Sequence, residues 1–372
     1  MSILTRFHAG YFRISLSLGL QALLWKVLLQ LHSKDAAFQG SGTKPKALYA
    51  TIVAVLWWFS VVVQVVLSLL YALKCFLCFN TIKAEFMHHV GVNYLFAPWI
   101  SWLFILESAP FVTPNHICFV VFWWVFAVPV VVLDVKIYGQ WFTKGKRFLT
   151  AVANPTSQLS VVGNLVGARA AAKMRWQEVA LFLFSLGMVH YLVLFVTLYQ
   201  RVAGGHVLPA MLRPVFFLFF AAPGVASLAW FSISGSFDTA SKMLFFLSLF
   251  MFASLICRPF MFKKAMERYN VAWWAYSYPI TMLALASTRY EEQVKGGVPR
   301  AIRLALSILS VLVLITLLIF TAANPKLLLP DHHHDHDNLR RLPITHCPKP
   351  TPTPTPTATA TALQKDTNVE GT

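Results

Sequence analysis

The sequence predicts an all-α membrane protein in which ten transmembrane helices form five helical hairpins around a central pore. Three observations lead to this fold class. Hydrophobic residues make up 57% of the 372-residue chain, apolar stretches of about spanning length recur ten times along it, and residues that break helices recur in every second stretch.

The composition excludes most soluble classes of protein. Only 12% of the residues are charged and the mean hydropathy is +0.62, whereas a soluble domain carries roughly 25% charged and about 45–50% apolar residues. The net charge of +17 would suggest nucleic-acid binding in a soluble chain, but here the basic residues lie between apolar stretches. There they can contact membrane lipid or concentrate anions at a pore mouth. We therefore expect no nucleic-acid partner, and a soluble enzyme or a secreted disulfide scaffold fits poorly.

A transmembrane helix needs about 20 predominantly apolar residues. The ten candidate stretches lie at 9–31, 47–72, 93–109, 116–134, 156–172, 178–199, 213–230, 239–256, 272–288 and 302–323. An even number of spans places both termini on one side of the membrane. Residues 1–325 therefore form the predicted transmembrane domain. Residues 326–372, which include PKPTPTPTPTATATA, cannot bury a core and are predicted to be a disordered cytosolic tail.

The odd-numbered stretches share a weak repeat, in which a helix-breaking residue lies within a few positions of Ser or Thr. The breaking residues are Gly10, Pro98, Pro155, Pro223 and Pro279. Proline within a helix frees a backbone carbonyl, which a membrane tolerates only where the group is buried in protein or lines an aqueous cavity. Prolines are also common in transmembrane helices generally. The alternation nevertheless favours five inner helices around a passage, with these breaking residues as pore-lining candidates.

The charged residues predict a passage that is neutral to positive. The acids of the apolar stretches fall at their ends: Glu107, Asp134, Glu178 and Asp238. A proton relay or a cation pathway therefore lacks its usual carboxylates, and anions are favoured. Arg13 follows the glycine break of the first stretch, and either points into the passage or anchors the helix end at the interface. Lys26, near the other end of that stretch, is expected to be such an anchor.

Loop charges give a modest signal for orientation. With a cytoplasmic N-terminus, eleven basic loop residues face the cytoplasm and seven face outward, in agreement with the positive-inside rule. Both termini are therefore predicted to be cytoplasmic. Lys146 and Arg147 would then lie at a basic cytosolic mouth of the pore.

The sequence predicts neither catalysis nor a bound cofactor or metal. DHHHDHD at 331–337 contains metal-ligating residue types, but it lies in the predicted tail without a scaffold to fix their geometry. We find no nucleophile–base pair, phosphate-binding glycine loop or set of spaced histidine boxes. His190, in the sixth stretch, is expected to be a packed or hydrogen-bonded core histidine.

Five segments resemble the plant slow-type (S-type) anion channels, which are related to the bacterial tellurite-resistance/dicarboxylate transporter family. They are RFHAGYFRISLSLGLQALLW (6–25), GVNYLFAPWISW (91–102), YGQWFTKGKRFLTAVANPTSQLSVVGNLVGA (138–168), LRPVFFLFFAAPGVASLAW (212–230) and NVAWWAYSYPIT (270–281). The resemblance runs from about residue 6 to residue 325 and is nearest to the short homologue branch of that family.

The resemblance implies passive conduction of chloride and nitrate across the plasma membrane, with one pore per subunit of a homotrimer. It also allows heteromers with related slow anion channels and regulation by protein kinases. An aromatic residue of the ninth helix, usually Phe, plugs the family's pore in the pattern A-W-W-x-Y/F-x-F-P, and that position here is Tyr278. Tyr278 is therefore the predicted pore gate, and a packed interfacial aromatic is the alternative.

Two departures from the family pattern leave more than one function open. The Tyr278 hydroxyl could bind an anion, and Arg13 stands where relatives commonly have a small residue. An anion channel subunit is the leading hypothesis. The alternatives are an electrically silent partner subunit that modulates related channels and a proton-coupled dicarboxylate carrier. The absence of acids from the middle of the predicted spans argues against the carrier.

Overall fold

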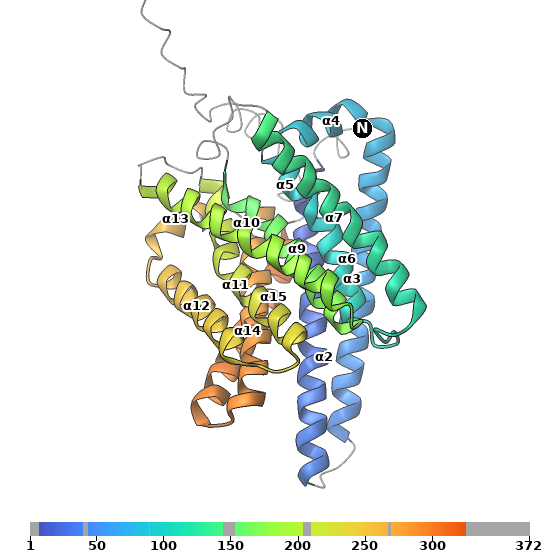
Figure 1. Cartoon of the computed structure of the whole chain (residues 1–372), viewed down its shortest axis with the longest axis vertical. Coiled ribbons are helices and arrows are strands. Elements are labelled where there is room, and N and C mark those ends of the chain that lie inside the picture. The colour runs from blue at the N-terminus through green and yellow to red at the C-terminus, as the bar shows by residue number, and fades with distance from the viewer. Residues whose placement is uncertain are drawn as a thin grey trace, which may run out of the picture. The chain divides into compact units, whose positions relative to one another are not determined.

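The computed structural model describes residues 7–39, 44–88, 90–143, 153–203, 210–266 and 269–324 (Figure 1). These residues form helices and connecting turns, and no strand occurs among them. All of them belong to one compact unit that spans Met1–Pro330. The predicted all-α class is confirmed. The predicted tail at 326–372 lies outside the described residues.

Ten helices in the described segments have 13 or more residues. They are α2 (Arg13–Gln39), α3 (Lys44–Leu77), α6 (Phe96–Ser108), α7 (Ile117–Thr143), α9 (Gln158–Lys173), α10 (Gln177–Ala203), α11 (Leu218–Ser234), α12 (Thr239–Ile256), α14 (Trp274–Val294) and α15 (Gly297–Ala323). Shorter elements precede or connect them: η1 (Ala9–Phe12), α4 (Phe79–Met87), α5 (Gly91–Tyr94), η2 (Pro155–Ser157), η3 (Ala210–Phe217), α13 (Phe260–Met266) and η4 (Val271–Trp273).

Five of the long helices form a closed inner ring. In this ring, α2 contacts α6, α6 contacts α9, α9 contacts α11, α11 contacts α14, and α14 contacts α2 again. Each ring helix also packs against the long helix that follows it in the chain, namely α3, α7, α10, α12 or α15. The helices therefore pair as five hairpins, and the first member of each hairpin belongs to the ring (Figure 1).

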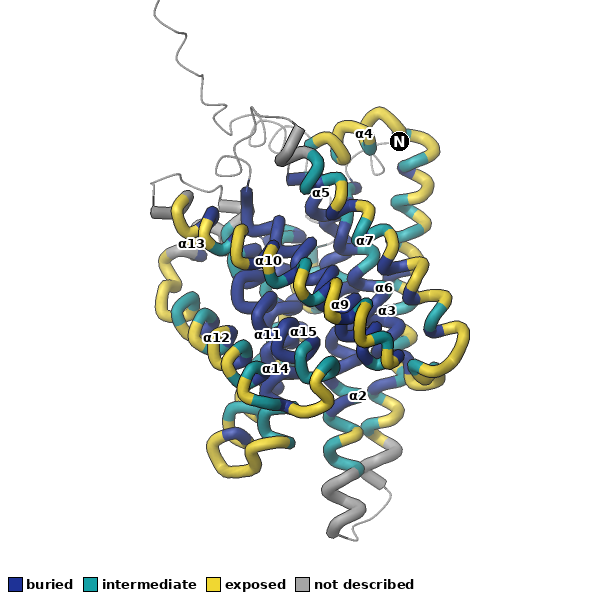
Figure 2. The backbone as a smooth tube through the Cα atoms, in the orientation of Figure 1, coloured by how far each residue is buried: buried dark blue, intermediate teal, exposed yellow. Residues whose placement is uncertain are grey.

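The two layers differ in burial and in composition. In α2 and α11, 61% and 72% of the most apolar window is buried, whereas in α3, α12 and α15 the figure is 22%. Figure 2 shows the same contrast, with dark blue tube concentrated in the ring helices. The outer helices expose large apolar side chains such as Trp58, Phe182 and Phe250. Such surfaces are stable in contact with lipid tails, so the outer layer suits a membrane.

Seven of the described helices are long and apolar enough to cross a membrane, and the bent pair Phe79–Met87 with Gly91–Ser108 can supply an eighth. The chain is therefore a multi-pass membrane protein. Helix α9 has only 16 residues, and α14 carries Arg289, Glu291 and Glu292 in its last turns. Neither is among these candidates, and the number of ten spans stays a prediction.

Three ring helices begin with the same local structure. His8, Asn154 and Asn270 have extended backbones, and each side chain accepts a hydrogen bond from the backbone N–H two residues later. A short 3-10 turn follows and leads directly into α2, α9 or α14. These side chains satisfy donors that a helix start leaves unpaired. The weak repeat of the sequence thus corresponds in three hairpins to a repeated helix cap.

The four prolines of that repeat occupy two kinds of position. Pro223 and Pro279 lie inside α11 and α14, where each deprives the carbonyl four residues earlier of its usual partner. Pro98 and Pro155 lie in the first turns of α6 and η2. Pro155 begins its turn, where backbone N–H groups have no partner within the helix, so it interrupts nothing. Pro98 lies within the helical segment Gly91–Ser108, where its missing N–H coincides with the break between α5 and α6. Gly10 lies in the 3-10 turn η1.

Candidate functional site

A small cavity lies between the ring helices, near the ends at which those helices begin. The residues that line it are Arg13, Leu16, Tyr94, Leu159, Val215, Leu218, Trp274, Ala275 and Tyr278. They come from α2, α5, α9, η3, α11 and α14, so each of the five hairpins contributes through its ring helix or the turn that leads into it. The cavity offers roughly the room of one water molecule.

Tyr278 closes this cavity on the side of α14. Its side chain is only 1% exposed, and its ring centroid lies 5.9 Å from that of Phe104 on α6. The hydroxyl is buried and has no hydrogen-bond partner among the described residues. A buried tyrosine O–H normally finds an acceptor. Tyr278 therefore presents an apolar ring together with an unused hydrogen-bond donor.

Arg13 is the cationic side chain of the cavity. It is 7% exposed, and its guanidinium carbon lies 4.5 Å from the centroid of the Tyr94 ring. Its Nε and Nη1 atoms are buried without hydrogen-bond partners in the described part of the chain. Stacking on an aromatic ring offsets only part of the cost of burying a charge. Arg13 is therefore suited to attract an anion into the cavity.

The turn before α2 positions Arg13. Burial, followed by the positive charges of Arg13 and Lys74, lowers the pKa of His8 to about 3. The neutral ring can then accept a hydrogen bond at Nδ1 from the Gly10 N–H, at 3.0 Å. A Cβ atom at residue 10 would lie 2.6 Å from His8 Cε1 and 3.2 Å from Arg13 Nη2. Only glycine leaves both side chains in place.

The structure brings two of the predicted site residues together, namely Arg13 and Tyr278. Pro155, Pro223, Pro279 and Gly10 are buried and Pro98 is half-buried, but these five residues are not among those that line this cavity. Lys146 and Arg147, the predicted basic mouth, lie outside the described residues.

The acids were predicted to lie at the ends of the apolar stretches, and the structure agrees for Glu107 but not for Asp134. Glu107 is the penultimate residue of α6. For Asp134 the prediction of a span end is wrong, because α7 continues through a more polar segment to Thr143. Asp134 is 1% exposed, and its Oδ2 accepts a hydrogen bond from Asn164 Nδ2 at 2.6 Å, between α7 and α9. Neither acid is among the residues that line the cavity.

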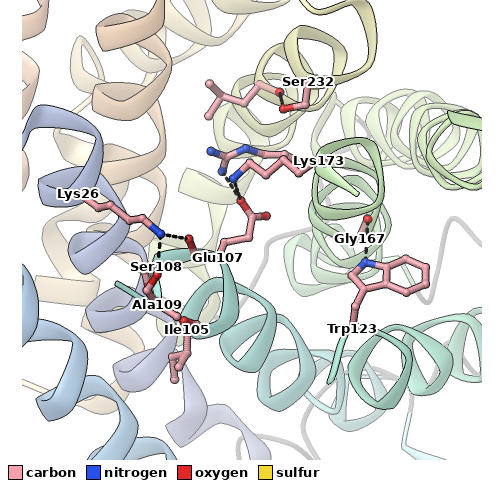
Figure 3. A network of polar contacts seen from close by, with 11 residues as sticks. Lys26, Ile105, Glu107, Ser108, Ala109, Trp123, Gly167, Lys173 and Ser232 are labelled. Carbon is pink, nitrogen blue, oxygen red and sulfur yellow. Dashed lines mark hydrogen bonds and ion pairs between the residues drawn. The ribbon is translucent and has the colours of Figure 1, made fainter. Parts of the chain in front are cut away.

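Sequence analysis missed Arg169, which lies in the fifth apolar stretch and is only 3% exposed. Its Nη1 lies 3.4 Å from Oε2 of Glu107, and Lys173 Nζ lies 2.5 Å from the same oxygen (Figure 3). The signal was the segment GARAAAK (167–173), which places two cations four residues apart on one face of a helix of small residues.

Lys26, predicted to be an interfacial anchor, instead donates hydrogen bonds to the backbone carbonyls of Glu107 and Ala109 at 3.0 and 2.7 Å.

His190 agrees with the expectation from the sequence. It is 1% exposed, and its Nδ1 lies 2.9 Å from Oγ of Ser160 on α9. The ring also lies 5.2 Å from that of Tyr138. It is a packed, hydrogen-bonded core histidine that ties α10 to α9.

A ring of buried helices within an apolar outer layer, around a cavity with a cation and no acid among its nine described lining residues, defines a multi-pass membrane protein of the transport class. The chain belongs to the voltage-dependent anion channel family, which it matches over residues 6–322. The predicted family is confirmed.

Three plant relatives support the same family. The S-type anion channels SLAH1 and SLAH4 of Arabidopsis thaliana are each 56% identical to this chain, over 88% and 90% of it and 84% and 88% of their own lengths. The guard cell S-type anion channel SLAC1 of Arabidopsis thaliana is 44% identical over 86% of this chain and 56% of its own length. These names describe channels, not enzymes.

Proposed function

We propose that the chain is a subunit of a slow-type anion channel that passes chloride and nitrate passively across the plasma membrane. In this proposal the five hairpins supply ten spans, both termini are cytoplasmic, and the ring helices surround the passage. Three copies assemble in contact with membrane lipid, and protein kinases are candidate regulators. The names of the Arabidopsis relatives support the choice of anions as cargo.

The observation that carries the proposal is the chemistry of the cavity between the ring helices. Its nine described lining residues include the cation Arg13, an unpaired tyrosine O–H and mostly apolar neighbours, with no carboxylate. Apolar walls lower the local dielectric, so one buried cation attracts an anion strongly there. A proton-coupled carrier would need an ionisable carboxylate beside this cation, and none is among the nine described lining residues. Asp134 does not line this cavity and is hydrogen-bonded to Asn164.

Tyr278 is the gate in this proposal. Its ring is held between the cavity and Phe104, and the cavity has room for about one water molecule. A hydrated anion needs more space than that. Conduction therefore requires the Tyr278 side chain to move, or to be shortened by mutation.

Voltage-clamp recording in oocytes tests the proposal. We compare wild type with Tyr278→Ala, which removes the ring, and with Tyr278→Phe, which keeps the ring and removes only the hydroxyl. We expect anion current from Tyr278→Ala that exceeds wild type at least tenfold, and no such increase from Tyr278→Phe. Silence of all three at confirmed surface expression would reject conduction by this chain alone.

One feature favours a second function, that of an electrically silent partner in trimers of related channels. The Arg13 guanidinium is buried in the same small cavity as Tyr278, and an anion held between them would leave slowly. Co-expression with a longer relative tests this role. We expect co-purification and altered current amplitude or selectivity, and unchanged currents without co-purification would reject it.

A further inference from the structure

A second group of charged side chains lies farther along the ring, away from Arg13. It consists of Lys26 on α2, Glu107 on α6, and Arg169 and Lys173 on α9, which are three successive helices of the ring. Lys26 lies 13 positions after Arg13 in α2, which corresponds to about 20 Å of helix rise. Figure 3 shows Lys173 and Glu107 pointing toward one another, with Lys26 approaching from another helix.

The cations of this cluster outnumber its acids. Arg169 and Lys173 both pair with the same oxygen, Oε2 of Glu107. Lys26 adds a third positive charge, which acts on both Glu107 and Arg169. Three cationic groups thus share one carboxylate. Arg169 is buried, whereas Lys26 and Lys173 are half-buried. Burying charge is costly unless it is balanced and hydrogen-bonded, so further negative charge beside Arg169 would stabilise the cluster.

The hydrogen-bonding capacity of the Glu107 carboxylate and of its partner Arg169 is only partly used. Its side chain is fully buried, yet Oε1 has no hydrogen-bond partner among the described residues. Nη1 of Arg169 is also buried without a hydrogen bond, at 3.4 Å from Oε2. A small free anion could lie between the three cations and adjust its position, whereas the carboxylate is held by its own backbone in α6.

The cluster lies within electrostatic reach of the proposed gate. The charge of Arg169 acts on Tyr278, and Arg169 is also influenced by Arg289 of α14. Arg289 has its own carboxylate partner, Glu292, at 2.5 Å. Among the cations of this cluster, Arg169 is therefore the one whose charge acts on the gate residue Tyr278.

We propose that the Glu107 carboxylate is a tethered anion that occupies a second anion-binding site formed by Lys26, Arg169 and Lys173. The ligand of this site is a small monovalent anion such as chloride or nitrate, which enters when Glu107 is neutralised or displaced. While Glu107 fills the site, it blocks the passage at a second point beyond Tyr278. This inference rests on the proposed function for the passage itself, but the binding site can be tested without it.

Anion binding to the purified full-length chain provides the first test. We titrate chloride and nitrate against wild type, Glu107→Gln and the control Asp134→Asn, and follow the melting temperature. Glu107→Gln keeps the shape of the side chain and removes its charge. We expect a saturable rise in Glu107→Gln that exceeds the rise in wild type and in Asp134→Asn by on the order of 5 °C. Asp134→Asn also neutralises a buried carboxylate, but one that accepts a hydrogen bond from Asn164 and forms no ion pair with the described residues.

A second variant separates the site from general destabilisation. In Glu107→Gln/Arg169→Met the central cation is also removed, and we expect the anion-dependent rise to disappear. If Glu107→Gln alone yields no folded protein, Glu107→Gln/Lys173→Gln replaces it, because this variant removes one charge of each sign and leaves two cations. An equal anion response in wild type and in the Glu107 variant that folds would overturn the inference.

Currents in oocytes then distinguish the inference from the proposed function. We expect Glu107→Gln/Tyr278→Ala to conduct several-fold more than Tyr278→Ala. Anion binding without current in this double variant would support the site and reject the passage. Current in Tyr278→Ala that is unchanged by Glu107→Gln would support the passage and overturn the block by Glu107.

Discussion

At the residue scale, the hydroxyl of Tyr278 is a buried polar group without a partner among the described residues, as is the hydroxyl of Tyr276. An unsatisfied buried donor costs about 1–3 kcal/mol. We predict that Tyr278→Phe raises the free energy of unfolding by about 1 kcal/mol, because only the hydroxyl is lost. Thermal unfolding in detergent measures this. A destabilised Tyr278→Phe protein would mean that the hydroxyl has a partner in the folded chain.

Arg13 determines the charge of the cavity in this account. We predict that Arg13→Met, introduced into the conducting Tyr278→Ala background, lowers anion current at least fivefold, because the buried attraction for the ion is lost. Arg258→Met is the matched control, since Arg258 is exposed and its charge is screened by salt. Equal effects of the two substitutions on whole-cell current would count against a role for Arg13 in the passage.

At the scale of single elements, the junction between α4 and α5 requires a glycine. A Cβ atom at Gly91 would lie 2.6 Å from the backbone oxygen of Glu85, so the two segments must separate to admit it. We predict that Gly91→Ala destabilises the protein by about 1–3 kcal/mol. Gly139→Ala is the control, because no atom of the described residues lies within 4 Å of a Cβ there and alanine favours the α7 helix. Similar melting temperatures for both variants would contradict this reading.

The start of α12 depends on the ionised Asp238. Slight burial opposes ionisation, but hydrogen bonds from the Ser241 N–H and Trp230 Nε1, both at 3.0 Å, outweigh it and hold the pKa of Asp238 below its usual range. This stabilisation is present above the unfolded pKa of about 3.9 and is lost as the pH falls through the lower folded pKa. We predict that the melting-temperature difference between wild type and Asp238→Ala is constant from pH 7 to pH 5 and shrinks below about pH 4. A difference that grew on acidification would contradict this assignment.

The sequence predicts the elements better than it predicts their ends. The eighth stretch, 239–256, coincides with α12, whereas the fourth ends nine residues early because α7 continues into polar sequence after Asp134. Prolines were an uneven guide to interruptions of the ring helices, since Pro155 lies in a first turn and Pro129 lies inside the outer helix α7. The caps at His8, Asn154 and Asn270 were the better-defined repeat, but an isolated polar residue before an apolar stretch is too common to single out.

The cluster of charged residues around Glu107 could not be predicted from the sequence for a different reason. Arg169 and Glu107 are 62 positions apart in the chain, and only the packing of α6 against α9 brings them within ion-pair distance. Tyr278 and Arg13 were found because a family pattern and a glycine break pointed to them. Their shared cavity could not be foreseen, because it depends on side chains from all five hairpins.

For the molecule as a whole, the closed ring of five helices is the feature on which function depends. Helix-breaking residues in every second apolar stretch predicted the two layers, and the order of helix contacts agrees with that prediction, although the outer helix α7 also contains Pro129. The ring places Tyr278, Arg13 and the Glu107 cluster in one interior, while the outer helices expose an apolar surface. The proposed ion passage therefore lies inside one chain, not at the contact between copies.

The measurement that tests this claim most directly is the reversal potential of the Tyr278→Ala current when external chloride is reduced tenfold with an impermeant anion at constant sodium. If an anion passage runs through the ring and Tyr278 closes it, the reversal potential moves in the positive direction by close to the Nernst value for chloride. A reversal potential that stays fixed on chloride replacement and shifts with sodium would contradict the account.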